Sequence, residues 1–266
     1  MIINSQKTVW ALDLNTHQMI GKPYRILPNT SLNQKFDILP DEDVGDEYPL
    51  LKYFAIGVGG ADIVNDSMLN HSNHKPIDAA LFEHIPFVMQ PIGDDLLPDE
   101  KVNYRFRIVE TFGGVEYACY YLRVIDNIEM KDGLYEINTS NNISSLGYFD
   151  TNRSDLLNPI PRIAGNYIAP AENTYIARVI KVLFELSVKE KEWLAEAIQI
   201  RHGGNRTLSE IGLCSGTDVV SPTSLEAKSV QVNYFVKVDI DMTEELVLEG
   251  AFVRNIEIGG SEPLVQ

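Results

Sequence analysis

The sequence is poor in cysteine, in positive charge and in long apolar runs, and each shortage excludes a class of protein. Its 266 residues include two cysteines, Cys119 and Cys214, which lie far apart in the sequence. Two distant cysteines provide neither a disulfide framework nor a cysteine zinc site. We therefore expect two buried thiols in a reducing compartment.

Positive charge is scarce: 22 Lys and Arg residues stand against 38 Asp and Glu residues, which gives a formal net charge of −16. Such acidity repels the phosphate backbone, so we expect no sequence-specific nucleic-acid partner. No apolar run approaches the roughly 18 residues that cross a bilayer. Residues 1–12 also lack the apolar stretch and cleavage site of a secretory signal. We expect neither a membrane protein nor secretion by that route.

Alternation of apolar and polar residues predicts a mainly β, β-rich α+β chain built of antiparallel modules. Residues 102–108 alternate with the period of a half-buried strand. A Gly-Gly pair at 113–114 suits a hairpin turn, and 115–125 returns rich in tyrosine and apolar residues. Because an Asp-Gly dipeptide at 132–133 provides a second turn, 102–138 is predicted as a three-stranded meander.

Other apolar stretches predict further strands and short elements. With Asp78 as its cap, 78–84 is expected to form one or two helical turns. The remaining strands are expected at 50–58, 175–186, 208–214, 230–240 and 245–258.

One prominent helix is predicted in the C-terminal half of the chain, at 188–201, and it is expected to be the longest. Ser187 and Glu190 have the spacing of a capping box, and a Gly-Gly pair at 203–204 ends the helical pattern. Its buried face is expected to hold Trp193, Leu194, Ala197 and Ile198, and its wetter face Lys189, Glu192 and Glu196.

Composition divides the chain into two β-rich regions and a long connection between them. The N-terminal region is 1–138, the connection is 139–173, and the C-terminal region is 174–266. The connection is rich in Asn, Ser, Pro and Gly. A structureless connection of that length is uncommon inside a compact domain and is usually functional or reaches a partner. We therefore expect a boundary there.

The residue patterns predict no catalytic, cofactor or metal site. A glycine cluster at 57–60 follows an apolar strand, but Asp62 and the lack of a following amphipathic helix exclude a dinucleotide-binding loop. A tight turn or bulge is expected instead. The Cys214-Ser215 pair lacks the flanking glycines of a nucleophile elbow, and apolar neighbours place Cys214 in the core.

Two groups leave metal binding open. His71 and His74 lie three residues apart, and with a nearby carboxylate they are ligand types for zinc or iron. They lie in a polar stretch without a predicted rigid element, and isolated loop histidines are common. Five carboxylates lie within 41–47, without the spacing of an EF-hand loop. A solvated acidic loop, or one that meets a basic partner, is the other interpretation.

Three segments resemble virion structural proteins of large tailed bacteriophages: Leu50–Gly60, Asp78–Phe87 and Ser209–Gly216. The third contains an E-I-G-L run like those of tail and tail-fibre proteins. The resemblance implies a structural subunit of the neck, tail or baseplate, made in the host cytoplasm and assembled into the virion. It implies other virion proteins as partners, a homo-oligomeric ring and no catalytic residue. Proline-broken segments at 20–50 and 138–173 offer extended arms that order on binding.

A self-contained β-rich module that binds a ligand or a carbohydrate is the alternative. Tyr117, Tyr120 and Tyr121 of the predicted hairpin can stack on sugars as readily as they fill a core. The exposure of these rings therefore distinguishes the two hypotheses. No motif in the sequence favours an enzyme.

Overall fold

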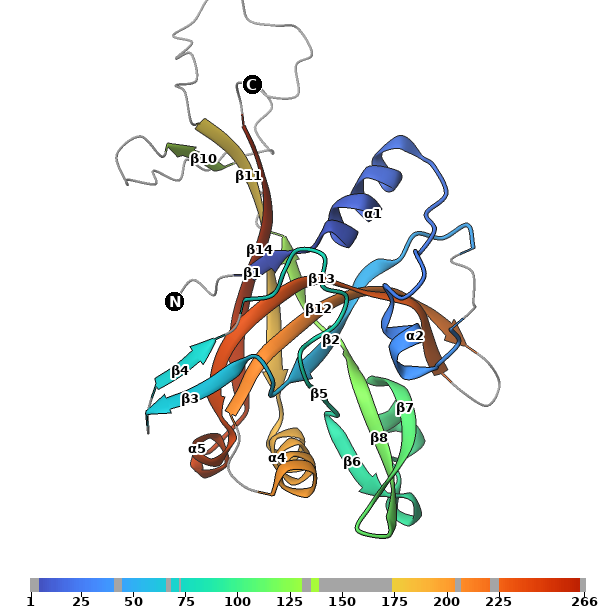
Figure 1. Ribbon diagram of the computed structural model, residues 1–266, viewed down its shortest axis with the longest axis vertical. Helices are drawn as coiled ribbons and strands as arrows, with labels where there is room; N and C mark the ends of the chain where they lie inside the picture. Colours follow the sequence, from blue (N-terminus) through green and yellow to red (C-terminus); the bar gives the residue numbers. More distant parts are fainter. Residues whose placement is uncertain are drawn as a thin grey trace, which may run out of the picture. The chain divides into compact units, whose positions relative to one another are not determined.

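The computed structural model (Figure 1) shows a mainly β protein with antiparallel sheets and few helices, as predicted. Strands occur on both sides of residues 139–173, which lie outside the described residues, so the boundary expected there stays a prediction. The structure describes residues 5–40, 45–65, 68–71, 73–130, 135–138, 174–203, 207–220 and 225–263.

The chain forms two compact units. The first contains Met1–Asp126 and Phe184–Arg254, and the second contains Asn127–Leu183 and Asn255–Gln266. The first unit therefore combines two segments that are separated by the larger part of the second unit in the sequence.

An eight-stranded sheet organises the first unit, with the order β1-β13-β12-β2-β8-β6, β5 beside β2 and β7 beside β8. Every pairing in it is antiparallel. Strand β2 pairs with β12, so the sheet joins residues that precede and follow the expected connection. The bounds are β1 Ser5–Lys7, β2 Leu50–Gly57, β5 His84–Ile85, β6 Val88–Pro91, β7 Tyr104–Phe112, β8 Val115–Val124, β12 Thr207–Val220 and β13 Leu225–Asp241.

The strands predicted at 50–58, 208–214 and 230–240 are confirmed by β2, β12 and β13. A separate pair is formed by β3 (Ala61–Asn65) and β4 (Met68–His71). The main core of the sheet includes Tyr53, Phe106, Tyr121, Leu122 and Phe235.

The β7–β8 hairpin is confirmed, but the predicted third strand of the meander is wrong. Strand β10 (Tyr135–Asn138) pairs with β11 (Thr174–Leu186) in the second unit, where Glu136 lies opposite Ile176. The side of β8 that a third strand would occupy is taken by β6 and β2. The sheet of the second unit has the order β10-β11-β14, with β9 (Ile128–Met130) also beside β11 and β14 at Phe252–Pro263.

The predicted helix is confirmed as α4 (Val188–His202), the longest helix of the described residues. Ser187 and Glu190 form the capping box, and Gly203 ends the helix in the left-handed conformation. The expected face is largely correct, because Leu194, Ala197 and Ile198 are buried while Lys189, Glu192 and Glu196 are wetter.

Two positions on α4 differ from the prediction. Trp193 is only half-buried, and its ring lies 4.6 Å from Nζ of Lys189. Lys191 is instead buried, with 2% of its surface exposed, because its Nζ donates to the carbonyl oxygens of Glu245 (2.8 Å) and Leu248 (2.9 Å).

Several short helices were not predicted. Helix α1 (Val9–Ile20) is capped by Thr8, whose side chain accepts from the Ala11 N–H, and α2 is Leu32–Phe36. Helix α5 (Met242–Val247) occupies the start of the strand expected at 245–258, which begins only at Phe252 as β14. The remaining turns are α3 (Pro98–Lys101) and the 3₁₀ helix η1 (Ile92–Asp94).

Candidate functional site

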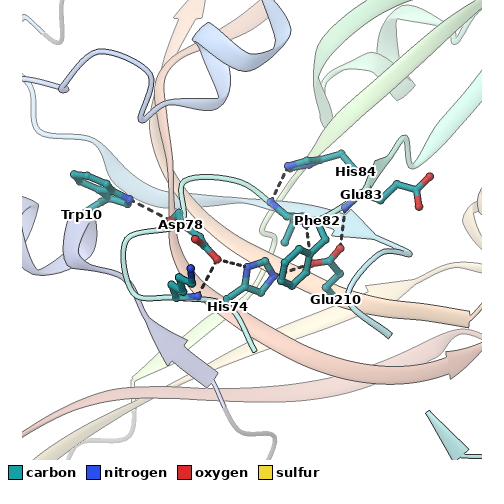
Figure 2. Close-up of polar contacts among 9 residues, drawn as sticks. Trp10, His74, Asp78, Phe82, Glu83, His84 and Glu210 are labelled. Atoms are coloured by element: carbon teal, nitrogen blue, oxygen red, sulfur yellow. Dashed lines mark hydrogen bonds and ion pairs between the residues drawn. The ribbon is translucent and has the colours of Figure 1, made fainter. Parts of the chain in front are cut away.

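A group of polar and aromatic side chains surrounds the buried His74 (Figure 2). We call this group the His74 cluster, and it consists of His74, Asp78, Phe82, Glu210 and Phe235. Nε2 of His74 lies 2.8 Å from Oε2 of Glu210, and Nδ1 lies 3.3 Å from Oδ2 of Asp78. Only 6% of the His74 surface is exposed. The cluster joins the segment 73–83 to β12 and β13.

Two aromatic rings enclose the imidazole of His74. The ring of Phe235 stacks on one side with centroids 3.8 Å apart, and the ring of Phe82 stacks with centroids 4.2 Å apart. The two ring nitrogens each face a carboxylate oxygen, so a ring N–H at either position has an acceptor within reach.

Glu210 fixes the backbone of the 73–83 segment. Its Oε2 accepts the N–H of Phe82 at 3.2 Å, and its Oε1 accepts the N–H of Glu83 at 3.1 Å. These bonds replace the intrahelical bonds that 78–84 would need, so the predicted helical turns there are wrong and the segment leads into β5. A carboxylate buried in an apolar strand thus holds a distant loop in place.

The glycine cluster at 57–60 gives this loop the room to approach. Gly57 lies opposite Glu210 in the sheet. A Cβ at Gly57 would lie 2.6 Å from Oε1 of Glu210 and 2.6 Å from the carbonyl oxygen of Glu83. Gly60 has a φ of 74° between β2 and β3, which confirms the predicted turn. Close backbone approach explains these glycines.

His84 lies beside the cluster and is neutral. Its Nε2 accepts the Leu81 N–H at 3.0 Å, and the edge-on ring of Phe36 lies 5.3 Å away. Burial, with smaller contributions from the charges of Lys35 and His74, lowers the pKa of His84 to about 3. This side chain therefore belongs to the core and adds no charge to the His74 cluster.

The space beside the His74 cluster is too small for a substrate. A cavity of about 10 Å³ lies between the 73–83 segment and strands β12 and β13, which is room for about one water molecule. The hydroxyl of Ser209 at its wall donates to the carbonyl oxygen of Gly59 at 2.6 Å. The arrangement cross-links three chain segments.

The model of a family of unknown function, DUF7208, matches residues 3–266. The chain belongs to the DUF7208 family. No curated protein and no solved structure matches it. DUF7208 membership thus covers both units and assigns neither of them an activity.

Of the two histidines weighed as metal ligands, the structure places the side chain of His74. Both ring nitrogens of His74 face carboxylates, and the side chain of His71 lies outside the described residues. In the part of the chain that the structure describes, no three His, Cys, Asp or Glu side chains are grouped so as to hold an ion.

The acidic loop 41–47 is described only from residue 45 onward. Asp46 and Glu47 are exposed and border an open depression of about 370 Å³ beside the adjoining ends of β12 and β13. Asp218 at its wall is already engaged by the Tyr53 hydroxyl at 2.7 Å and by Arg105 at 2.9 Å.

Both cysteines are free and buried, as predicted. Burial raises the pKa of the Cys119 thiol to about 12, and burial also raises the pKa of Cys214. Neither thiol is a ready nucleophile, because the thiolate is the reactive form.

Two of the three tyrosines that could stack on a sugar are closed to it. Tyr120 and Tyr121 are each 2% exposed, and Tyr117 is half-buried against the core. The Tyr120 hydroxyl donates to Asp95 at 2.7 Å, and the Tyr121 hydroxyl donates to Glu110 at 2.5 Å. Burial raises the pKa of both phenols, and the acceptor carboxylates raise it further. Their faces fill the core and are closed to a sugar.

Glu210 is the functional-site residue that sequence reasoning missed. It lies within the segment predicted as a strand at 208–214, where it is the one charged residue among apolar and small ones. That isolated charge was the available signal. Its partner His74 is 136 positions away, so spacing gave no sign of the pair.

Among the described residues, no helix combines the length and apolar character that crossing a bilayer requires.

Proposed function

We propose that this protein is a structural subunit of a tailed-bacteriophage virion, in the neck, tail or baseplate, that acts by binding other proteins. The observation that carries the proposal is an uncharged, apolar face on helix α1. We call it the outer face of α1, and it consists of Leu12, Asn15, Thr16, Met19 and Ile20.

The outer face of α1 has the character of a protein-binding surface. Leu12, Met19 and Ile20 repeat at helical spacing and are exposed, Met19 by 81%. Asn15 and Thr16 complete the face, so that it carries no charge. In a chain with a net charge of −16, such a face is unusual, and clustered exposed apolar side chains mark contact sites for proteins.

The three segments that resemble phage structural proteins lie together in the first unit. Strand β2 pairs with β12, and β5 pairs with β2 where Ile85 lies opposite Ile56. Glu210 of the third segment accepts the N–H of Phe82 in the second segment. This supports reading the segments as one module, consistent with the resemblance.

The carbohydrate-binding alternative loses its main support. It requires exposed rings in the hairpin, but Tyr120 and Tyr121 are buried and Tyr117 is half-buried. The cavity beside His74 has room for about one water, so it offers no ligand site either.

Two measurements test the proposal. Mass spectrometry of purified virions is expected to find this chain at a fixed copy number, and native mass measurement of the isolated protein is expected to find a specific oligomer. Absence from the virion overturns the virion assignment. A strict monomer that binds a glycan on an array returns the interpretation to a self-contained binding module.

A further inference from the structure

A second exposed apolar surface lies at helix α5, which packs beside α4 (Figure 1). We call it the α5 patch, and it consists of Val188, Leu246, Val247 and Leu248. Each of these side chains is at least 43% exposed, and Val247 is 81% exposed. Clustered exposed apolar side chains mark contact sites for proteins.

Lys191 holds the α5 patch in a fixed conformation. Its buried Nζ donates to the carbonyl oxygens of Glu245 at 2.8 Å and Leu248 at 2.9 Å. Carbonyl groups at the end of a helix lack partners within the helix, and a cation there is favourable. Val188 lies one turn before Lys191 on α4. The apolar side chains are therefore presented on an ordered surface.

Acidic side chains accompany the α5 patch. Glu244 and Glu249 come just before and just after its apolar run, and Glu192 follows one turn after the valine of the patch on α4. All three are exposed. Lys189, a cation on the same helix, is already paired with Glu100 at 2.6 Å. The α5 patch therefore favours a partner whose apolar side chains are accompanied by positive charge.

The outer face of α1 has this complementary character. Its residues carry no charge, and two exposed cations, Lys22 and Arg25, follow soon after the last turn of the helix. The one acidic residue of α1 is Asp13, whose carboxylate lies 3.3 Å from Nδ1 of His17. One chain thus carries both an apolar surface with carboxylates and an apolar surface with cations.

The start of helix α1 is anchored to the first unit, which fixes the outer face in place. The N–H of Val9 donates to the carbonyl oxygen of Pro76 at 2.9 Å. The indole N–H of Trp10 donates to the carbonyl oxygen of Asp78 at 3.2 Å (Figure 2). Neither surface therefore needs to be ordered when a partner binds, which lowers the cost of the contact.

We propose that the outer face of α1 in one copy of this chain docks on the α5 patch of the next copy. The contact removes both apolar surfaces from water and joins opposite charges. Two α5 patches would instead set carboxylates against carboxylates. Because two different surfaces meet, the contact is heterologous and continues from copy to copy, as a ring if the rotation closes. The inference rests on the proposed function and names the partner of the outer face of α1.

Two single variants and their mixture test the contact. Met19→Asp alters the outer face of α1, and Val247→Asp alters the α5 patch; both positions are 81% exposed, so both chains should fold. Each variant alone should associate at least about tenfold more weakly than the unchanged chain in analytical ultracentrifugation, because a charge enters an apolar contact. The mixture should form dimers with one copy of each variant and nothing larger, since one variant keeps its α5 patch and the other keeps its outer face of α1.

Controls separate this contact from the virion assignment. Val220→Asp, an exposed position on β12, should assemble as the unchanged chain does. The proposal is overturned by an unchanged chain that stays monomeric at every concentration, by Val247→Asp that still assembles, or by a mixture that stays monomeric. Normal assembly of a chain with Lys22→Glu and Arg25→Glu also overturns it. Presence in virions despite any of these results leaves the proposed function standing, whereas absence from virions with dimers in the mixture removes that function and keeps the contact.

Discussion

Helices α4 and α1 belong to the same unit but are fixed in different ways. Helix α4 starts with its own capping box and buries a row of apolar side chains, including Leu194 and Ile198. Helix α1 buries Ala11 and Leu14, exposes apolar residues on its outer face and relies on distant polar partners. Trp10 bonds to a residue 68 positions away, and Thr8 bonds to one 224 positions away.

The difference separates a helix defined by its neighbours in sequence from one defined by the fold. Local signals make α4 recognisable from the sequence. Its buried apolar side chains then stabilise it by packing into the core. Tertiary polar contacts hide α1 from sequence analysis and let its attachment change when those contacts change. Five predictions test this contrast, from the largest expected effect to the smallest.

Leu194→Ala should produce the largest loss of stability. Removing a fully buried leucine side chain costs about 2–5 kcal/mol through lost transfer energy and the cavity left behind. Urea denaturation should show this loss for the whole first unit. Glu192→Ala on the exposed face of the same helix is the control and should change stability by less than about 0.5 kcal/mol. Equal effects of the two changes would show that the face assignment is wrong.

Glu210→Gln should cost about 1–3 kcal/mol, because a buried group that accepts three hydrogen bonds is replaced by one with a misplaced donor. Hydrogen exchange is expected to rise in α1 as well as in the 73–83 segment. Glu196→Gln, on the exposed face of α4, is the matched control. If α1 keeps its protection in Glu210→Gln, the link from the His74 cluster to α1 is refuted.

Thr8→Ala should destabilise the protein by about 0.5–2 kcal/mol, the usual cost of losing an N-cap. The same hydroxyl also donates to the carbonyl oxygen of Val232 at 2.8 Å. Thr16→Ala, on the outer face of α1, should change the melting temperature little. A loss in Thr16→Ala as large as that in Thr8→Ala would argue against tertiary anchoring of the helix start.

The start of helix α4 should lose stability at low pH. Burial raises the pKa of Glu190, but the charge and hydrogen bond of Arg123 and the bonds from Ser187 outweigh it, so the net pKa is lowered. A lowered carboxyl pKa gives stability that is present above the unfolded pKa of about 4.3 and is lost as pH falls through the folded pKa. Denaturation at decreasing pH should show this loss at α4, and Glu190→Gln should reduce the slope. An unchanged slope would exclude Glu190 as the source.

Met19→Asp should have the smallest effect on the isolated protein, within about 0.5 kcal/mol, because the side chain is exposed. Its effect should appear in assembly, where a charge enters the outer face of α1. Incorporation into virions is the measurement, and Val220→Asp, an equally exposed apolar position on β12, is the control. Normal incorporation of Met19→Asp would mean that α1 is not the contact.

Sequence patterns predicted the elements whose causes are local. The alternation at 102–108 and the Gly-Gly turn specified the β7–β8 hairpin, and the capping box specified α4. The helical turns expected at 78–84 failed because Glu210, far away in the sequence, takes the backbone N–H groups of Phe82 and Glu83. Position along the chain carries no information about such a partner.

The same reason explains the meander and the site. Strand β10 has ordinary strand residues, but its partner is β11 and not the preceding hairpin. The His74 cluster joins residues from three separate stretches, and the histidine spacing within 71–74 gave no sign of its partners on β12 and β13. Helix α1 was missed because apolar side chains lie on both its buried and its exposed sides, so its sequence lacks the clear amphipathic pattern of a surface helix.

The pairing of β2 with β12 also means that the sheet cannot be completed until late in synthesis. Glu210 lies opposite Gly57, so 210 minus 57, or 153 residues, separate the two partners. At a translation rate of about 5–20 residues per second, the edge of β2 that pairs with β12 stays unpaired for roughly 8–30 seconds, until β12 has been synthesised. During that interval an apolar strand edge is open to other nascent chains. Yield in a heterologous host should therefore depend on chaperone supply more than on the stability of the finished protein.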